Sequence, residues 1–392
     1  MSHGTKTRLL VLLPTFLLSC LMLGIRSRSS ADRFPADPGY DYVLSAHVSG
    51  VRSWFNLDPY LHIGAHFVSW VINFFPLDRQ AIAMSSAVHL IWALTGCGLL
   101  FVLQKDQRSP WIQVAGVLAL VLCPAAAESA LGNVGNLKWP LITLAVLVAS
   151  SSEVYAHPRA WSVFFVLTGL TNPLIPLISV PLLLQYWKCG PTERRALRVP
   201  IAAVMLTLVI QVSVVGLRGV SQGRGGSRIY EPWPGMGLFW WFGMLSPTVI
   251  CLLYLSVSNL TRILRKDQFL TRTAIGSIVL AVASIAYGGI GDRYFVAPMI
   301  LSWIILAAAA EEIAMRFGMK LRLALAVFTL LILAVPSIKW FGSSWYLTSG
   351  PRWSAEIKSA KDQCKQGTDV VTIQVGTDNM TQLTCSYILS RS

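Results

Sequence analysis

Long apolar runs alternate with short polar connections along most of this chain. About eleven runs are present, near residues 9–25, 82–103, 110–124, 139–152, 160–170, 174–187, 199–217, 238–259, 273–290, 295–313 and 323–338. A helix that crosses a bilayer needs about 20 apolar residues, and the runs between 110 and 187 are shorter. We expect these to be half-helices or tilted helices packed inside the protein, because lipid does not tolerate exposed backbone. The pattern predicts an α-helical polytopic membrane protein with about eleven transmembrane or half-spanning helices.

The composition agrees with a membrane protein. Hydrophobic residues make up 54% of the 392 residues and charged residues 13%, and the mean hydropathy is +0.58. Water-soluble chains carry about 25% charged residues. The net charge of +14 could suggest a nucleic-acid partner, but Lys and Arg lie in short connections between apolar runs. That placement is typical of a topology signal, so we expect a lipid bilayer as partner and no nucleic acid.

Lys and Arg are concentrated in alternate connections, which indicates the orientation. Six segments hold 16 of the 32 Lys and Arg, namely 1–8, 104–109, 153–159, 188–198, 260–272 and 314–322. Cytoplasmic loops carry the excess of these residues. We therefore expect a multi-pass protein of the cell membrane, with a cytoplasmic N-terminus and an extracytoplasmic C-terminus.

The N-terminal run has an alternative interpretation as a cleaved signal peptide. Lys6 and Arg8 precede it, as they would in a signal peptide. The run continues past Cys20 to Ile25 and ends in Arg26, which favours a membrane anchor.

The residues after 338 are no longer apolar enough for a membrane. Two domains are therefore expected, a membrane-embedded domain over 1–338 and an extracytoplasmic tail over 339–392. The pattern predicts a small α+β unit, with a helix over 353–364 and strands over 369–375 and 382–389. Cys364 and Cys385 are the two cysteines of this tail. An oxidising compartment would let them pair, so we expect a disulfide.

Acidic residues mark the first extracytoplasmic segment, which covers 26–81. Asp37, Asp41 and Asp58 precede His62 and an amphipathic stretch over 63–75, which we expect to lie along the membrane interface. A carboxylate at a dry membrane boundary is costly unless it is used or paired. One of these aspartates could act as a general base, and the alternative is that each simply forms a turn.

The segment 124–140 is the most unusual polar string of the chain. It combines one acid, two amides and a cation with glycines that permit close approach of the backbone: Glu128, Asn133, Asn136 and Lys138. Such groups could bind a sugar and a phosphate. The alternative is a re-entrant turn whose amides satisfy their own backbone.

Arginines in two later extracytoplasmic segments could bind an anion. Arg293, beside Asp292 and Tyr294, stands at the mouth of an apolar run, and Arg228 lies in another loop. Arginine binds phosphate through two parallel hydrogen bonds, which lysine cannot form. An ion pair with Asp292 or an interfacial anchor is the alternative for Arg293. No CxxC, His-x-x-His or HExxH spacing occurs, so the residues alone predict no metal site.

Four strings resemble the GT-C superfamily of integral-membrane glycosyltransferases, particularly its actinobacterial members. They are Asp58-Pro-Tyr-Leu-His62 with Phe67–Trp70 and Pro76, Glu128 to Trp139, Leu170–Pro173 with Pro176 and Pro181, and Asp292–Pro298. The resemblance extends over nearly the whole chain. Pro59, His66 and Lys138 depart from the residues common in the family, which are Gly, Arg and His.

The resemblance implies transfer of a sugar from a polyprenyl-phosphate donor to a glycan, glycolipid or protein acceptor of the cell envelope. The catalytic base is expected at Asp41, with Asp58 as the alternative. Donor phosphate and substrate are expected to bind at Arg293, Tyr294, Glu128, Asn133, Asn136, Lys138, Arg228 and His62. The resemblance also allows a divalent cation, and no other cofactor is expected.

Two other function classes fit a polytopic chain with polar loops. A transporter or lipid-linked glycan flippase should contain internal repeats and charges within its spans, and neither is evident. A non-enzymatic scaffold would not need clustered acids and arginines at one face.

Overall fold

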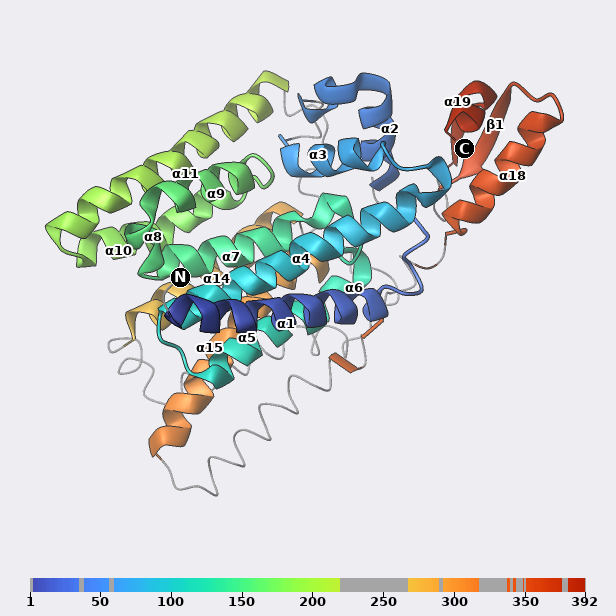
Figure 1. Ribbon diagram of the computed structural model, residues 1–392. Coiled ribbons are helices and arrows are strands. Elements are labelled where there is room, and N and C mark those ends of the chain that lie inside the picture. Colours follow the sequence, from blue (N-terminus) through green and yellow to red (C-terminus); the bar gives the residue numbers. More distant parts are fainter. Residues whose placement is uncertain are drawn as a thin grey trace.

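The chain folds into a bundle of helices that carries a small two-stranded sheet near its C-terminus (Figure 1). The structure is a computed structural model, and it describes residues 3–34, 39–55, 60–218, 267–288, 292–316, 337–338, 341–342, 348, 350–375 and 380–391. The predicted predominance of helix is confirmed.

Nine of the expected apolar runs coincide with described helices. The helices are α1 (His3–Arg26), α4 (Gln80–Lys105), α5 (Pro110–Leu122), α7 (Lys138–Ser150), α9 (Pro158–Gly169), α10 (Ser179–Lys188), α11 (Pro191–Arg218), α14 (Gln268–Gly288) and α15 (Val296–Arg316). The expected run 238–259 and nearly all of 323–338 lie outside the described residues. Local sequence explains several helix starts. Pro110 and Pro158 occupy the first turns of α5 and α9, and the Ser109 hydroxyl accepts the Ile112 N–H at 3.4 Å.

Helix α7 forms the centre of the bundle. Eleven of its 13 residues are buried, and α4, α9, α10, α14 and α15 all pack against it. A helix that is apolar on every side is expected to be buried. Three tryptophans reinforce this core from α4, α7 and α15, because Trp92, Trp139 and Trp303 are each at most 1% exposed.

Two of the described helices are long and apolar enough to cross a membrane. They cover Leu77–Lys105 and Pro191–Val214, and shorter apolar helices include Val11–Arg26, Pro110–Leu122 and Gln268–Ala283. These two helices weakly support membrane association. They do not establish the expected eleven spans or their orientation.

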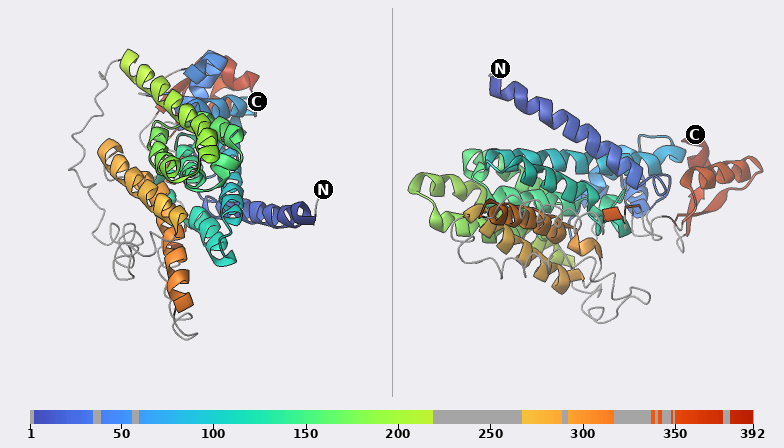
Figure 2. Two further views of the ribbon diagram at one scale, coloured as in Figure 1. Left: turned by 90° about the vertical axis from the view of Figure 1, so that its left-hand side faces the viewer. Right: turned by 90° about the horizontal axis from the view of Figure 1, so that it is seen from below.

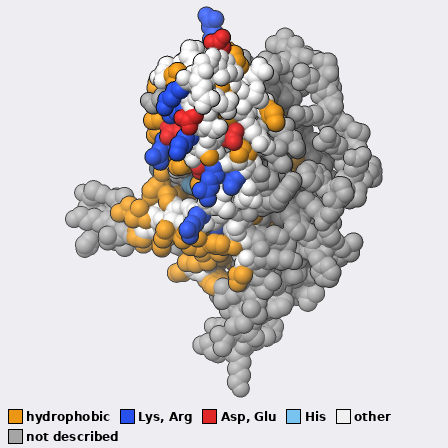
Figure 3. Space-filling model, turned by 90° about the vertical axis from the view of Figure 1, so that its right-hand side faces the viewer, with side chains coloured by type: hydrophobic (Ala, Val, Ile, Leu, Met, Phe, Trp, Pro, Cys, Tyr) orange, Lys and Arg blue, Asp and Glu red, His pale blue; other side chains and the backbone are white. Residues whose placement is uncertain are grey.

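Large hydrophobic side chains are exposed along the outer helices. On α1 the exposed set is Val11, Leu13, Leu17, Leu18, Leu21 and Ile25, and on α11 it includes Val199, Met205, Leu206, Val209 and Val212. Apolar patches of this kind are uncommon on soluble monomers and mark contact with a membrane or another protein. When the molecule is viewed from the end that carries the tail, charged side chains gather in the upper part and a hydrophobic patch lies below them (Figure 3).

The segment before α4 contains more helix than the sequence predicts. The expected amphipathic stretch is α3 (Ile63–Ile72), and it is preceded by α2 (Gly39–Ser49) and the short helix η1 (Gly50–Phe55). A further short helix, η2 (Leu77–Arg79), leads into α4. Neither α2 nor η1 was expected, because the acidic and Gly-Pro-rich sequence around Asp37 suggests turns.

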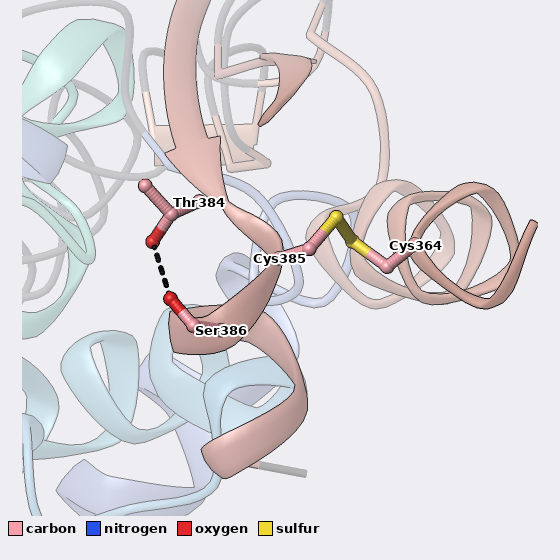
Figure 4. The surroundings of a disulfide bond; sticks show 4 residues. All are labelled: Cys364, Thr384, Cys385 and Ser386. Carbon is pink, nitrogen blue, oxygen red and sulfur yellow. Dashed lines mark hydrogen bonds between the residues drawn. A yellow bond between two sulfur atoms is a disulfide. The ribbon is translucent and has the colours of Figure 1, made fainter. Parts of the chain in front are cut away.

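The tail consists of α18 (Trp353–Lys365), the antiparallel strands β1 (Val370–Gln374) and β2 (Met380–Thr384), and α19 (Cys385–Ser390). The predicted helix and first strand are confirmed. The predicted strand 382–389 is wrong in its second half, because the chain turns into a helix at Cys385. This turn buries Cys385 and Ile388 on one side of α19. The predicted disulfide between Cys364 and Cys385 is present (Figure 4).

The two chain ends lie at opposite ends of the bundle (Figures 1 and 2). We call the end that carries the tail, α2 and α3 the tail end. The connection between α4 and α5 and the start of α14 lie at the opposite end.

Candidate functional site

Polar segments that are far apart in the sequence meet at the tail end. Lys138, at the start of α7, donates a hydrogen bond from Nζ to Tyr60 Oη at 2.6 Å. The same ammonium lies 5.3 Å from the Tyr60 ring centroid and 5.4 Å from that of Trp139. We call the group Tyr42, Tyr60, His62, His66, Asn133, Asn136, Lys138, Thr171 and Asn172 the tail-end cluster.

His62 is fully buried within this cluster. Its Nε2 lies 3.0 Å from the Gly135 carbonyl oxygen, and a carbonyl accepts only, so this nitrogen carries the proton. Burial, together with the Lys138 charge, lowers the pKa of His62 to about 3. The imidazole is therefore neutral at physiological pH. Its Nδ1 is a buried acceptor that has no hydrogen-bond partner among the described residues.

The loop before α7 comes close to the aromatic side chains of the cluster. The Asn133 side chain accepts the Gly135 N–H at 2.9 Å and fixes the short helix η3 (Val134–Asn136). A Cβ at Gly135 would lie 3.4 Å from the Tyr42 ring. The Tyr42 ring in turn lies 4.8 Å from that of His66, edge to face. The loop backbone at position 135 thus lies against the Tyr42 ring.

Asn136 and Tyr294 flank the first turn of α7. Asn136 Oδ1 accepts the indole N–H of Trp139 at 3.1 Å. The Trp139 ring packs edge to face on Tyr294, with centroids 5.5 Å apart. Tyr294 belongs to η6 (Asp292–Phe295), so the structure brings the second and the last of the predicted polar segments together.

Thr171 and Asn172 join the cluster from the loop after α9. Asn172 Nδ2 donates to the Lys138 carbonyl at 3.2 Å, and Thr171 Oγ1 accepts the Gly64 N–H at 3.1 Å. Gln211 of α11 supports the same region, because its amide bonds both the N–H and the carbonyl of Leu61 at 3.1 Å. Gln211 is not among the residues expected from the sequence, although an amide within an apolar helix is a recognisable signal.

Among the predicted catalytic aspartates and phosphate-binding arginines, only Asp41 has a side chain that the structure describes. Asp41 lies in the first turn of α2, where its side chain is exposed between the buried Tyr40 and Tyr42. Asp58 and Arg228 lie outside the described residues. The backbones of Glu128 and Arg293 belong to α6 (Ala126–Ser129) and η6, which are in contact, but the description does not extend to their side chains.

The opposite end carries a separate network of charged groups. Arg108 forms two hydrogen bonds with Asp267, and Asp106 Oδ1 accepts the Ser152 hydroxyl at 3.0 Å. Burial raises the pKa of Asp106. These residues and Arg272 line an open pocket of about 570 Å³. The tail-end cluster contributes no residue to this pocket.

Metal-ligand side chains do not gather in the part of the chain that the structure describes. No group of three or more His, Cys, Asp or Glu is placed there to hold a metal ion. His62 and His66 are the two histidines of the cluster, and the carboxylate of Asp41, the expected base, is exposed.

No family model matches this chain, and no curated protein matches it. The resemblance to the GT-C superfamily therefore rests on the four sequence strings.

Proposed function

We propose that this protein is a multi-pass membrane glycosyltransferase of the GT-C type. It transfers a sugar from a polyprenyl-phosphate donor to an acceptor of the cell envelope on the extracytoplasmic side. One observation carries the proposal, namely that four polar segments meet at the tail end although they lie up to about 230 residues apart. Their contacts include Lys138 with Tyr60, Asn172 with Lys138, and Trp139 with Tyr294.

The arrangement of the two ends supports the membrane part of the proposal. Connections rich in Lys and Arg meet at the opposite end, where Arg108 pairs with Asp267 across 159 residues. The exposed leucines and valines of α1 and α11 offer surfaces for lipid. With a cytoplasmic opposite end, the tail-end cluster faces the extracytoplasmic side, where lipid-linked sugars are used.

Lys138 is the described cation best suited to the donor phosphate. Its ammonium is held between Tyr60 and Trp139, so its position is fixed before a ligand binds. Preorganised positive charge stabilises the negative charge that develops on a leaving phosphate. Arg293, carried by η6 near α6, is proposed as a second phosphate ligand, and Arg293→Lys should weaken donor affinity because the planar fork is lost.

The reaction needs a base for the acceptor hydroxyl. Asp41, or in its place Asp58, takes the hydroxyl proton, and the acceptor oxygen attacks the anomeric carbon of the sugar. The bond between that carbon and the phosphate oxygen breaks, and the lipid phosphate leaves with the electron pair. The buried amides and rings of the tail-end cluster provide hydrogen bonds and stacking surfaces for the sugar. A divalent cation would add charge at the phosphate.

A transporter or lipid-linked glycan flippase is the second candidate. The open pocket of about 570 Å³ at the opposite end is the observation that favours it, since a transporter must open toward both sides of the membrane in turn. The two candidates differ in whether a glycosidic bond forms.

The test is a transfer assay with the purified protein in lipid nanodiscs. Radiolabelled polyprenyl-phosphate mannose, arabinose and glucose are offered with envelope glycans as acceptors. Lys138→Met should lower transfer by about 100-fold or more, the usual effect of removing one preorganised donor. Lys188→Met, an exposed change at the opposite end, is the matched control and should leave transfer unchanged. Absence of transfer with every donor, combined with ligand movement across proteoliposomes, would favour the transporter.

A further inference from the structure

Helix α2 lies between the tail and the tail-end cluster. Tyr40, Val43 and Ala46 are at most 5% exposed, and Tyr42 is equally buried. In an α-helix residues three or four apart share one face. Tyr40, Val43 and His47 therefore line one side of α2, and Tyr42 points in another direction.

An aromatic group joins the first turn of α2 to the tail. The Tyr40 ring lies 5.2 Å from the ring of Trp353, the first residue of α18, and 5.2 Å from that of Phe34. Phe34 and Trp353 pack edge to face at 4.8 Å. All three side chains are at most 5% exposed, so this group is a small hydrophobic core shared by the two segments.

Two further contacts hold the same face of α2. The His47 ring stacks on Tyr387 of α19 with centroids 4.0 Å apart. Asn73, after α3, donates from its side-chain Nδ2 to the Val43 carbonyl at 2.9 Å. The backbone carbonyl of Asn73 accepts a hydrogen bond from the Arg391 guanidinium. The tail thus contacts α2 directly at Tyr40 and His47, from two different helices, and is linked to Val43 only through Asn73.

The tail is itself fixed against the membrane-embedded domain. Trp353 donates its indole N–H to the Leu77 carbonyl at 2.6 Å and its backbone N–H to the Asp32 carbonyl at 2.8 Å. Asp32 also accepts from the backbone N–H of Ser354 at 3.2 Å, which caps α18. The disulfide links α18 to the start of α19, so the two contacting helices move as one unit (Figure 4).

The other side of α2 meets the tail-end cluster. The Tyr42 ring lies 4.8 Å from that of His66 and 5.6 Å from that of His62, and it packs against Gly135. Asp41 stands between the tail-facing Tyr40 and the cluster-facing Tyr42. A shift of α2 would therefore displace both the proposed base and one wall of the cluster.

We propose that the C-terminal tail positions the tail-end cluster through α2, with Trp353 as the positioning residue that acts through Tyr40. The effect on turnover rests on the proposed function, while the mechanical coupling does not. A displacement of about 1 Å can cost about 100-fold in rate. Removing the Trp353 ring should lower kcat by about 10-fold or more and change the donor KM little, because Lys138 lies on α7 and not on α2.

Hydrogen exchange measured by mass spectrometry on the full chain in nanodiscs tests the coupling without any substrate. Trp353→Ala should increase amide exchange in α2 and in residues 132–138, while residues 380–391 stay protected by the disulfide. Trp353→Phe keeps a ring against Tyr40 and Phe34 and should restore most of the protection. Lys358→Ala, an exposed change on α18, is the matched control and should alter neither region.

Several outcomes separate the coupling from the proposed function. Faster exchange confined to the tail, with α2 and 132–138 unchanged, would overturn the positioning role. If Trp353→Ala loosens the whole tail, Tyr387→Ala removes the contact with His47 instead and must still raise exchange in α2. Intact coupling in a protein that transfers no sugar would support the positioning role and reject the proposed function. A fall in kcat that Trp353→Phe rescues supports both.

Discussion

The burial of His62 leads to a quantitative prediction about pH. Burial and the charge of Lys138 lower the pKa of His62 from 6.5 to about 3 in the folded protein. Below pH 6.5 the unfolded chain binds a proton at this residue, whereas the folded chain does not until about pH 3. The stability that His62 contributes in its neutral form is therefore fully present above pH 6.5 and is lost progressively as the pH falls toward 3. One pKa unit corresponds to about 1.4 kcal/mol, so acidification from pH 7.5 to 5 should cost about 2 kcal/mol through this residue.

The variant His62→Gln isolates this contribution. A glutamine amide can donate to the Gly135 carbonyl as the imidazole Nε2 does, but it does not titrate in this range. The free energy of unfolding is measured by denaturant titration in detergent micelles at pH 7.5 and pH 5. The natural protein should lose about 2 kcal/mol more than the variant over this interval. Thr192→Ala, an exposed change at the opposite end that removes no titratable group, is the control and should leave the pH dependence intact.

An equal loss of stability in the natural protein and in His62→Gln would refute the reasoning. It would mean that water or another partner stabilises the protonated imidazole inside the cluster. The neutral form of His62, and with it the assignment of Nδ1 as a buried acceptor, would then be wrong.

Three further predictions concern chemistry and stability. Asp41→Asn should lower turnover by about 100-fold or more while donor binding survives, as expected for loss of a general base; near-normal transfer, with loss in Asp58→Asn, would assign the base to Asp58. Cys364→Ala should lower protein yield, since closing a loop of about 20 residues contributes about 3 kcal/mol; alkylation of both Cys364 and Cys385 without reductant would contradict the pairing. Gln211→Leu should lower the free energy of unfolding by about 1–3 kcal/mol, because buried backbone groups lose their partner, and denaturant titration measures this; an unchanged midpoint would contradict it.

The helices of the bundle could be predicted because their cause is local. The runs 82–103 and 139–152 are apolar over a helical length, and they match α4 and α7 within about two residues at each end. Pro110 and Pro158 begin helices α5 and α9, because the fixed φ of proline suits the first position of a helix. The positive charge of alternate connections likewise indicates which loops share an end, and the Arg108–Asp267 contact agrees with that grouping.

The elements that were missed depend on contacts with distant parts of the chain. Helix α2 is buried on more than one side, with Tyr40 against the tail and Tyr42 against the cluster, so it has no single apolar stripe. At the C-terminus the alternation of apolar and polar residues continues through Leu383, Cys385 and Tyr387 and suggests a strand. The disulfide and the packing of the tail favour a helix instead, since the buried Cys385 and Ile388 are three apart and share one helical face.

The candidate site was predicted as a set of residue types but not as a geometry. Asn133, Asn136 and Lys138 stand out as an unusual polar string, and His62 belongs to a string that resembles the GT-C superfamily; the structure brings the four together. The partnership of Lys138 with Tyr60 spans 78 residues, and no periodicity encodes it. Long-range pairs of this kind follow from the packing of whole helices.

The central claim is that the tail-end cluster faces the extracytoplasmic side of a membrane and the opposite end faces the cytoplasm. Single cysteines at Thr192, Gln268 and Lys358, all exposed, can be introduced into a protein that lacks its native unpaired thiols. Intact cells are then treated with a membrane-impermeant thiol reagent. We expect cysteine at 358 to react at once, while those at 192 and 268 react only after the membrane is permeabilised. Reaction at 268 in intact cells, or protection at 358, would contradict it.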